Sequence, residues 1–269
     1  MENKKLTHNY DFLHHKKHHI KATKYIKHHK TYFKLDYNQL LILDSLLDTG
    51  GTEKKYLDKT SNLRYSEHFG LLDFNKSKLE KIIISANTNR EDEDDLDILL
   101  PMDLPDIKDY EYMFHTHPPT PFPGSRAVNG ILYEFPSISD VYHFADHFNS
   151  GETQGSLIIA PEGIYIIRAR DKLKKIDYPK SNKIFKILSK EVFTIQKLAI
   201  EKYGTDFDLE IFYSIISRDN HYLKMLNKLF EKYWGKLIKI YLKPRVKDQI
   251  TRKWILKSLL LPVIPYELK

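Results

Sequence analysis

Two histidines and an aspartate stand close enough along the chain to share one metal ion. His115 and His117 alternate at the end of a strand-like segment, and Asp140 follows at the start of a helical pattern. Because side chains alternate along a strand, both imidazoles point to one face and Thr116 points away. Two nitrogens and one carboxylate oxygen leave a fourth position of a tetrahedral zinc ion open, as in catalytic zinc sites. A histidine pair of this kind can also be structural or merely exposed.

The polar residues at that helix start have a second interpretation. Ser137 or Ser139 would serve as the N-cap of a helix that begins in the group Ser137-Ile138-Ser139-Asp140. Asp140 in the first turn would stabilise the helix through its macrodipole. A first-turn carboxylate can also face a metal, so the two roles of Asp140 are compatible. His143 and His147, four residues apart, lie away from the apolar stripe of this helix, and we interpret them as surface residues.

The elements that must position these residues follow from hydrophobic periodicity. The amino-terminal part of the pattern predicts a helix over 37–48 ended by Gly50-Gly51, and strands over 67–74 and 81–86. It continues with a strand from 110 that delivers His115 and His117, a helix over 137–148, and a hairpin of strands 155–160 and 163–168. Residues 119–136, rich in proline and glycine, read as a long loop inside the motif, and long ordered loops tend to be functional.

Beyond residue 179 only helical periodicity is evident, over 184–203, 222–234 and 250–260. The predicted fold class is therefore α/β, with a mixed β-sheet flanked by helices and followed by an α-helical C-terminal domain. We expect three parts: a basic, His-rich and partly disordered extension over 1–34, a domain over 35–172 that contains the candidate metal ligands, and a basic helical domain over 173–269. The acidic run over 90–97 is expected to be an exposed loop.

Composition limits the compartment and the partners. The chain has 269 residues, no cysteine, 41% hydrophobic and 29% charged residues and a net charge of +7, and no apolar run is long enough to span a membrane. With no apolar signal region near Met1, we expect an intracellular protein of the cytoplasm or nucleus that is not secreted. Without cysteine, any zinc must be held by histidine and carboxylate. The basic ends, 1–34 and 171–269, could contact nucleic acid, an acidic partner or an anionic surface, or be solvated faces only.

Taken together, these motifs resemble the signature of the JAMM (MPN, or JAB-like) zinc metalloproteases. That signature is a glutamate on an early strand, then His-x-His-Pro, then Ser-x-x-Asp at a helix start. Here Glu67 with Gly70 looks like its Glu-x-x-Gly-x-Leu strand, followed by the His115 motif and the Ser137 group. The resemblance covers residues 35–170. Glu53 competes for the role of the glutamate, and the spacing to Gly70 favours Glu67.

The resemblance implies an MPN-type sheet and a zinc-dependent isopeptidase or peptidase. His115, His117 and Asp140 would bind Zn²⁺, Glu67 would be the general base for a zinc-activated water, and Ser137 would stabilise the oxyanion unless it is only an N-cap. The implied substrates are conjugates of ubiquitin or a ubiquitin-like protein. The alternative is a catalytically inactive MPN scaffold in a multiprotein or virion assembly. The Lys, Ile, Asn and Tyr content also resembles JAMM-like proteins of large DNA viruses.

The chain departs from the family pattern in two places. The spacing between His117 and Ser137 is longer than usual, and an insertion separates the first helix from Glu67. Neither insertion removes a proposed ligand. Both are expected to reshape or cover the surface around the site.

Overall fold

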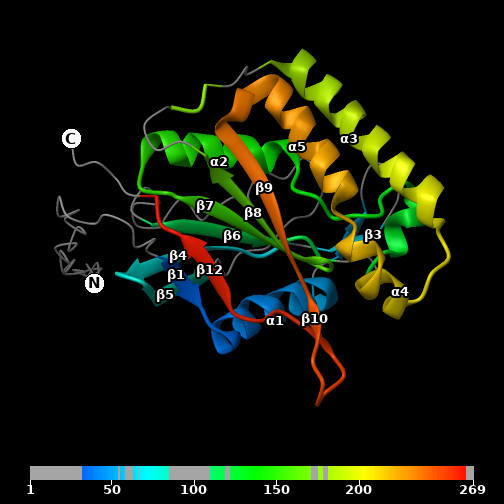
Figure 1. The fold of residues 1–269 in the computed structure, drawn as a ribbon, viewed down its shortest axis with the longest axis horizontal. Helices are drawn as coiled ribbons and strands as arrows, with labels where there is room; N and C mark the ends of the chain where they lie inside the picture. Colours follow the sequence, from blue (N-terminus) through cyan, green and yellow to red (C-terminus); the bar gives the residue numbers. More distant parts are fainter. Residues whose placement is uncertain are drawn as a thin grey trace, which may run out of the picture.

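A mixed eight-stranded β-sheet with helices on both faces forms the centre of the structure (Figure 1). The computed structural model describes residues 32–53, 55–57, 63–65, 67–84, 110–118, 122–170, 175–177 and 181–264. The strand order is β12-β1-β5-β4-β6-β7-β8-β9. Neighbours are parallel at β1/β5 and β6/β7 and antiparallel elsewhere. The predicted α/β class with a mixed sheet flanked by helices is therefore confirmed.

The strands of this sheet are β1 (Tyr32–Leu35), β4 (Phe69–Asn75), β5 (Lys78–Ile84), β6 (Tyr112–Thr116), β7 (Gly155–Ala160), β8 (Gly163–Ala169), β9 (Ile238–Pro244) and β12 (Leu259–Pro262). Two small ribbons pair β2 (Lys55–Leu57) with β3 (Leu63–Tyr65) and β10 (Val246–Lys247) with β11 (Trp254–Ile255). The α-helices are α1 (Tyr37–Glu53), α2 (Ile138–Ser150), α3 (Asn182–Tyr203), α4 (Leu209–Ser214) and α5 (Asn220–Trp234). Short 3₁₀ turns are η3 (Ser125–Asn129), η4 (Ile216–Arg218) and η5 (Gly235–Leu237).

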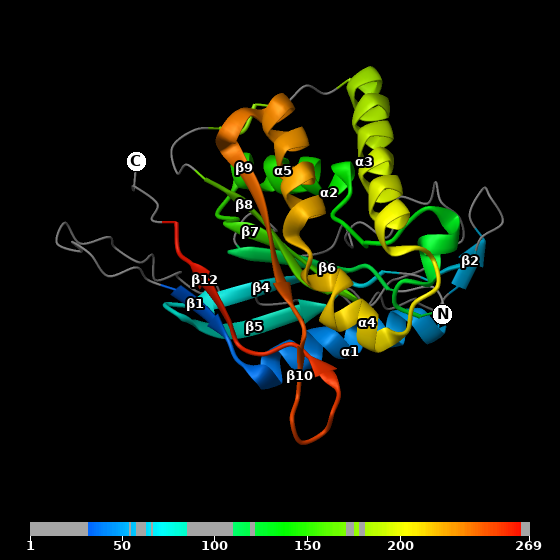
Figure 2. The same ribbon diagram turned by 45° about the vertical axis from the view of Figure 1, so that its right-hand side comes forward.

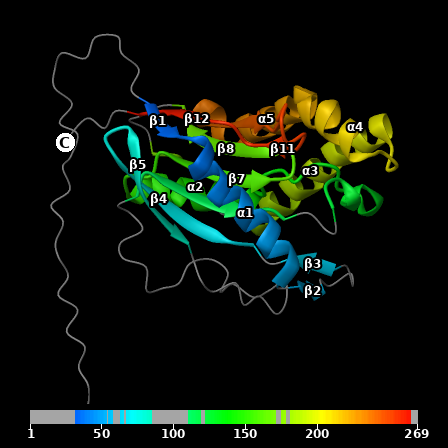
Figure 3. The same cartoon turned by 90° about the horizontal axis from the view of Figure 1, so that it is seen from below.

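The helices form two layers around the sheet. Helix α1 covers one face, while α2, α3 and α5 cover the other (Figure 2), and the view from below shows α1 lying across the strands (Figure 3). The α1 face buries Leu40, Leu43 and Leu47 against strand residues such as Phe114. The opposite face is a larger apolar core between the sheet and α2, α3 and α5. Strands β6 and β7 are buried along their whole length between these layers.

Two expectations about element boundaries need correction. Helix α1 continues through Gly50-Gly51 to Glu53 rather than stopping at the glycine pair. The first strand begins at Tyr32, inside the segment expected as an extension, and Phe33 is buried as a core residue. The rest of that extension, residues 1–31, and the acidic run over 90–97 lie outside the described residues.

The prediction that the C-terminal part is entirely helical is wrong. Strand β9 pairs antiparallel with β8, and β12 pairs antiparallel with β1, so this part of the chain completes both edges of the sheet. The predicted helix over 250–260 is replaced by a turn, in which Asp248 accepts the N–H of Thr251 at 2.7 Å, and by the strands β11 and β12. Strand pairing with distant partners overrides the local helical pattern here. No helix in the described part of the chain is long and apolar enough to cross a membrane.

Arg245, between β9 and β10, links the C-terminal part of the chain to helix α1. Its guanidinium donates two hydrogen bonds to Asp44 on α1, at 2.5 and 2.7 Å, and a third to the carbonyl of Pro161 at 2.7 Å. Only 5% of Arg245 is exposed. A bidentate arginine in such a position is a specific link, because a lysine could not match both carboxylate oxygens.

We expect Arg245→Met to lower the free energy of unfolding by about 3 kcal/mol, because Asp44 would be left partly buried without its cation. Lys247→Met is the matched control, since Lys247 pairs with Glu210 in an exposed ion pair and should lose under about 1 kcal/mol. Urea denaturation of both variants measures the difference. Equal losses would contradict the role given to Arg245.

Candidate metal centre

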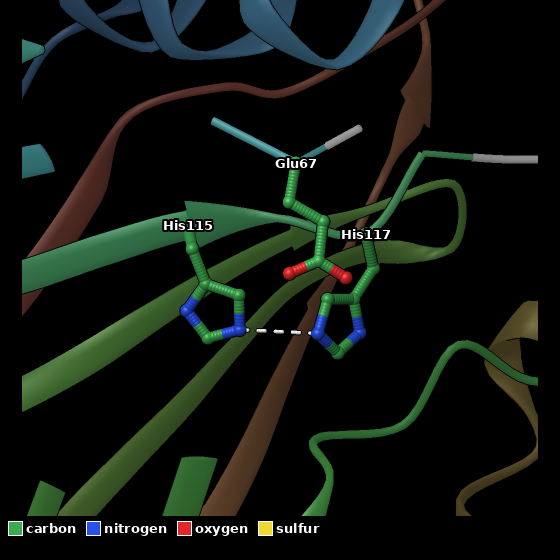
Figure 4. Close-up of side chains that lie close together, drawn as sticks. All are labelled: Glu67, His115 and His117. Carbon is green, nitrogen blue, oxygen red and sulfur yellow. Dashed lines mark hydrogen bonds between the residues drawn. The ribbon is translucent and has the colours of Figure 1, made fainter. Parts of the chain in front are cut away.

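The two histidines are anchored at the end of the central strand β6. His115 pairs with Phe69 of β4 on one side and Ile158 of β7 on the other. The N–H of His117 donates to the carbonyl of Ile159 at 2.8 Å, so the backbone pairing with β7 continues one residue beyond β6. Figure 4 shows the two imidazoles side by side with the Glu67 carboxylate next to them. His115 and His117 therefore point to the same face of the strand, as predicted.

Asp140 completes a triangle with the two imidazoles. Nε2 of His115 and Nε2 of His117 lie 3.0 Å apart, and the Asp140 carboxylate oxygens lie 3.2 and 3.4 Å from them. Bonds of about 2.0–2.1 Å to a tetrahedral ion set neighbouring ligand atoms about 3.3 Å apart. The three side chains are therefore spaced as ligands of one small cation would be.

The start of α2 fixes the direction of the Asp140 carboxylate. Ser137 is the N-cap: its Oγ accepts the N–H of Asp140 at 3.1 Å, and Asp140 in turn accepts the N–H of Ser137 at 2.6 Å. This reciprocal capping box confirms Ser137 as the cap and satisfies two backbone donors at the helix start. The same carboxylate thus caps the helix and faces the histidines.

Glu67 reaches the site through a contact between strands. It lies just before β4, which begins at Phe69 and not at Glu67 as predicted. The hydroxyl of Thr116 accepts the N–H of His68 at 2.8 Å, and the N–H of Thr116 donates to the carbonyl of His68 at 2.9 Å. A carboxylate oxygen of Glu67 and one nitrogen of each imidazole lie within 4.8 Å of one another. Glu53, the competing candidate, is the last residue of α1.

Gly70 has a packing reason for its place three residues after Glu67. A Cβ on Gly70 would lie 2.3 Å from the Phe114 ring and 2.2 Å from the Ile83 carbonyl oxygen. A larger residue would therefore push β4 away from β6. Because Glu67 lies just before β4 and the histidines lie at the end of β6, this close approach of the two strands helps to set their separation.

The carboxylates favour positive charge at this place. Burial opposes a charge on His117, but its hydrogen bond with Asp140 and the charges of Glu67, Asp140 and Glu134 outweigh burial and raise the pKa of His117 to about 10. Burial likewise opposes the charge of Asp140, and the charges and hydrogen bonds of His115 and His117 hold the pKa of Asp140 well below its usual range. A proton on His117 and a metal ion would both meet this preference, and the two would compete.

Glu134, in the long loop, was missed by sequence reasoning. Its carbonyl oxygen lies 3.2 Å from Nδ1 of His117. Since a carbonyl can only accept, Nδ1 carries the hydrogen and Nε2 faces Asp140. The side chain of Glu134 forms an ion pair with Arg126 at 2.5 Å. No pattern in the loop sequence marks Glu134, because the contact involves its backbone.

Glu162 is a second missed residue. It is fully buried at the β7–β8 turn, and its Oε1 accepts the N–H of Glu134 at 2.5 Å and the hydroxyl of Tyr165 at 3.4 Å. Its Oε2 has no hydrogen-bond partner among the described residues. Burial, followed by the charge of Glu134, raises the pKa of Glu162 to about 7. In the sequence, Pro161-Glu162 looks like an ordinary exposed turn.

Helix α3 holds the loop from the other side. Oε1 of Gln196 accepts the N–H groups of Leu132 and Tyr133 at 3.0 and 3.1 Å, and its Nε2 donates to the Tyr133 carbonyl at 2.7 Å. Leu132, Tyr133 and Phe135 are buried in the core between the sheet and the helices. The part of the predicted loop over 132–135 is therefore packed against the body, whereas 119–121 lie outside the described residues.

His143 and His147 form no comparable site. Both are half-buried on α2 rather than exposed as predicted, and burial lowers the pKa of His147. Within the described ranges, the residues grouped closely enough to share a metal ion are Glu67, His115 and His117. The two α2 histidines therefore serve as a control pair.

Comparison with known proteins adds a relative but no activity. An uncharacterized protein of Acanthamoeba polyphaga mimivirus is 35% identical over 243 residues. The aligned span covers 86% of this chain and 65% of the relative's length. No family model matches the chain. No solved structure matches it either.

We expect Glu162→Gln to change how stability depends on pH. A glutamate with a pKa of about 7 in the folded protein, against 4.5 ordinarily, keeps a proton that the unfolded chain releases. The free energy of unfolding should therefore fall as pH rises from 4.5 to 7, by up to about 1.4 kcal/mol per pH unit. The glutamine variant lacks this decline, so it should gain stability relative to the wild type as pH rises from 4.5 to 7 in denaturation experiments. Parallel curves would refute this.

Proposed function

We propose that this chain is a zinc-dependent metallopeptidase of the JAMM (MPN) type. It hydrolyses an isopeptide or peptide bond, with conjugates of ubiquitin or a ubiquitin-like protein as substrates. The observation that carries the proposal is the convergence of His115, His117 and Asp140 at ligand spacing with Glu67 beside them. The histidines lie at the end of β6, Asp140 at the start of α2 and Glu67 just before β4. The fold, rather than closeness along the chain, therefore brings Asp140 and Glu67 to the histidines.

The architecture supports the same proposal. An MPN-type domain, as the resemblance implies it, has a mixed sheet between helices, with the histidine motif on a strand and Ser-x-x-Asp at the start of the next helix. Here β6 carries the histidines in the middle of the sheet, and α1 and α2 pack on opposite faces. This arrangement of β6, α1 and α2 supports the proposal of an MPN-type domain.

The chain's own residues have distinct tasks in this reaction. His115, His117 and Asp140 would hold the zinc ion, and neutral imidazole and carboxylate are suitable donors for it. When bound, zinc acts as a Lewis acid and lowers the pKa of a coordinated water to about 7. Glu67 would take a proton from the attacking water and return it to the leaving amine. Ser137 keeps a hydroxyl hydrogen available for the oxyanion, because its Oγ accepts in the helix cap.

The alternative function is a catalytically inactive scaffold in a multiprotein or virion assembly. A scaffold would need the sheet and its helices but not four polar residues directed at one point. Grouping partly buried histidines and carboxylates is less favourable for folding than apolar packing. An intact set therefore favours catalysis, and the viral relative, which has no stated activity, leaves both functions open to test.

We expect purified protein to contain about one zinc ion per chain, since the site offers three protein ligands and one open position. The double variant His115→Ala/His117→Ala should lose this zinc, as measured by elemental analysis. His143→Ala/His147→Ala is the matched control, because it removes a histidine pair from α2 and leaves the cluster intact. An equal zinc content in the two double variants would contradict the assignment of His115 and His117 as metal ligands.

For activity, we expect the protein to cleave linked ubiquitin chains and to stop when a chelator is added. Glu67→Gln should reduce the rate about 100-fold or more while keeping the zinc, because it removes only the proton transfer. Glu80→Gln, on the exposed side of β5, is the control and should cleave normally. Cleavage that survives Glu67→Gln would exclude Glu67 as the base. Zinc-loaded protein that cleaves no chain would favour the scaffold.

A further inference from the structure

The ring of His117 depends on a carbonyl that belongs to no helix or strand. Its Nδ1 donates to the Glu134 carbonyl at 3.2 Å, and Glu134 lies in an irregular segment between η3 and α2. In metal sites, the partner of the second ring nitrogen fixes both the tautomer and the orientation of the ligating histidine. Whatever holds Glu134 in place therefore acts on the site.

We propose that Glu162 is a positioning residue of this centre, which orients His117 by holding the backbone of Glu134. The inference rests on the proposed function in one respect, namely that His117 is a metal ligand. The path is short: Oε1 of Glu162 accepts the Glu134 N–H at 2.5 Å, and the carbonyl of the same residue accepts from His117. Loss of the first bond removes the support that Glu162 gives to the residue that makes the second.

Glu162 is itself firmly held. It is fully buried, and the hydroxyl of Tyr165 donates to the same Oε1 at 3.4 Å. Its turn is tied down by Arg245, whose N–H donates to the Glu162 carbonyl at 3.1 Å and whose side chain donates to the carbonyl of Pro161. A carboxylate on such a support can impose a position on the loop.

Two neighbouring side chains contact other groups of this loop. Arg126 donates to the side-chain carboxylate of Glu134. Gln196 binds the backbone of Leu132 and Tyr133, before Glu134 is reached. Glu162 thus contacts the backbone of the residue whose carbonyl meets His117.

The variants separate the acceptor from the bulk of the side chain. Glu162→Met keeps the volume and removes the acceptor, whereas Glu162→Gln retains an oxygen for the Glu134 N–H. Glu162→Asp keeps the carboxylate but withdraws it by one methylene, and it replaces the methionine variant if that one does not fold. Gln154→Met is the matched control: Gln154 is buried and accepts the N–H of Ile264 at 2.8 Å, near the opposite end of β7.

The first measurement needs no metal. In protein labelled with ¹⁵N-histidine, the Nδ1–H proton of His117, assigned with His117→Gln, should exchange slowly with solvent in the wild type, Glu162→Gln and Gln154→Met. It should exchange about 10-fold faster or disappear in Glu162→Met and Glu162→Asp. The second measurement is zinc affinity, which should fall about 10-fold in the same two variants only, as loss of outer-shell support commonly does.

Slow exchange and unchanged zinc affinity in both Glu162→Met and Glu162→Asp would overturn the positioning role. So would an equal loss in Glu162→Gln, because the acceptor would then not be the cause. A wild type that binds no zinc would instead refute the proposed function, while the exchange rates would still decide whether Glu162 orients the ring. The two failures are therefore distinguishable.

Discussion

The pairing of β6 between β4 and β7 is the constraint on which the candidate centre depends. Antiparallel pairing with β4 brings the segment before Phe69 next to the end of β6, and parallel pairing with β7 holds the histidine motif on its other side. Thr116, which points away from the histidine face, bonds to both backbone groups of His68. The residue between the two histidines thereby places the glutamate opposite them, and a shift of either register would disperse the site.

Several groups at the centre have more than one task. The Asp140 carboxylate caps α2 and faces both imidazoles, so the stability of the helix start and the geometry of the ligands are coupled. The loop before α2 also has two roles. Its residues Leu132 and Tyr133 pack into the core, and the following residue, Glu134, contacts His117. An insertion that looks separate from the site in the sequence is, in the fold, part of its support.

The sequence predicted the features that depend on residues close together in the chain. The predictions that failed concern residues whose structure depends on partners far away in the chain. The alternation of His115 and His117, the cap at Ser137 and the β7–β8 hairpin follow from spacing and turn chemistry, and the structure shows each of them. The edge strands β9 and β12 were missed because their partners, β8 and β1, lie far away in the sequence. The buried state of Glu162 could not be predicted either, since a glutamate after proline in a turn is ordinarily exposed. Metal binding, the identity of the metal and the reaction stay predictions of the sequence motif.

The pairing of β1 with β12 also has a consequence for how the molecule assembles. Tyr32 faces Pro262 across this pair, and Leu256, Leu259 and Leu261 belong to the same apolar cluster as α1. Contacts between residues so far apart form slowly, because a long loop must close first. During synthesis the strands and helix that carry the histidines and Asp140 emerge well before β12. The apolar cluster beneath α1 therefore gains its last members, Leu256, Leu259 and Leu261, only when this end of the chain has been made.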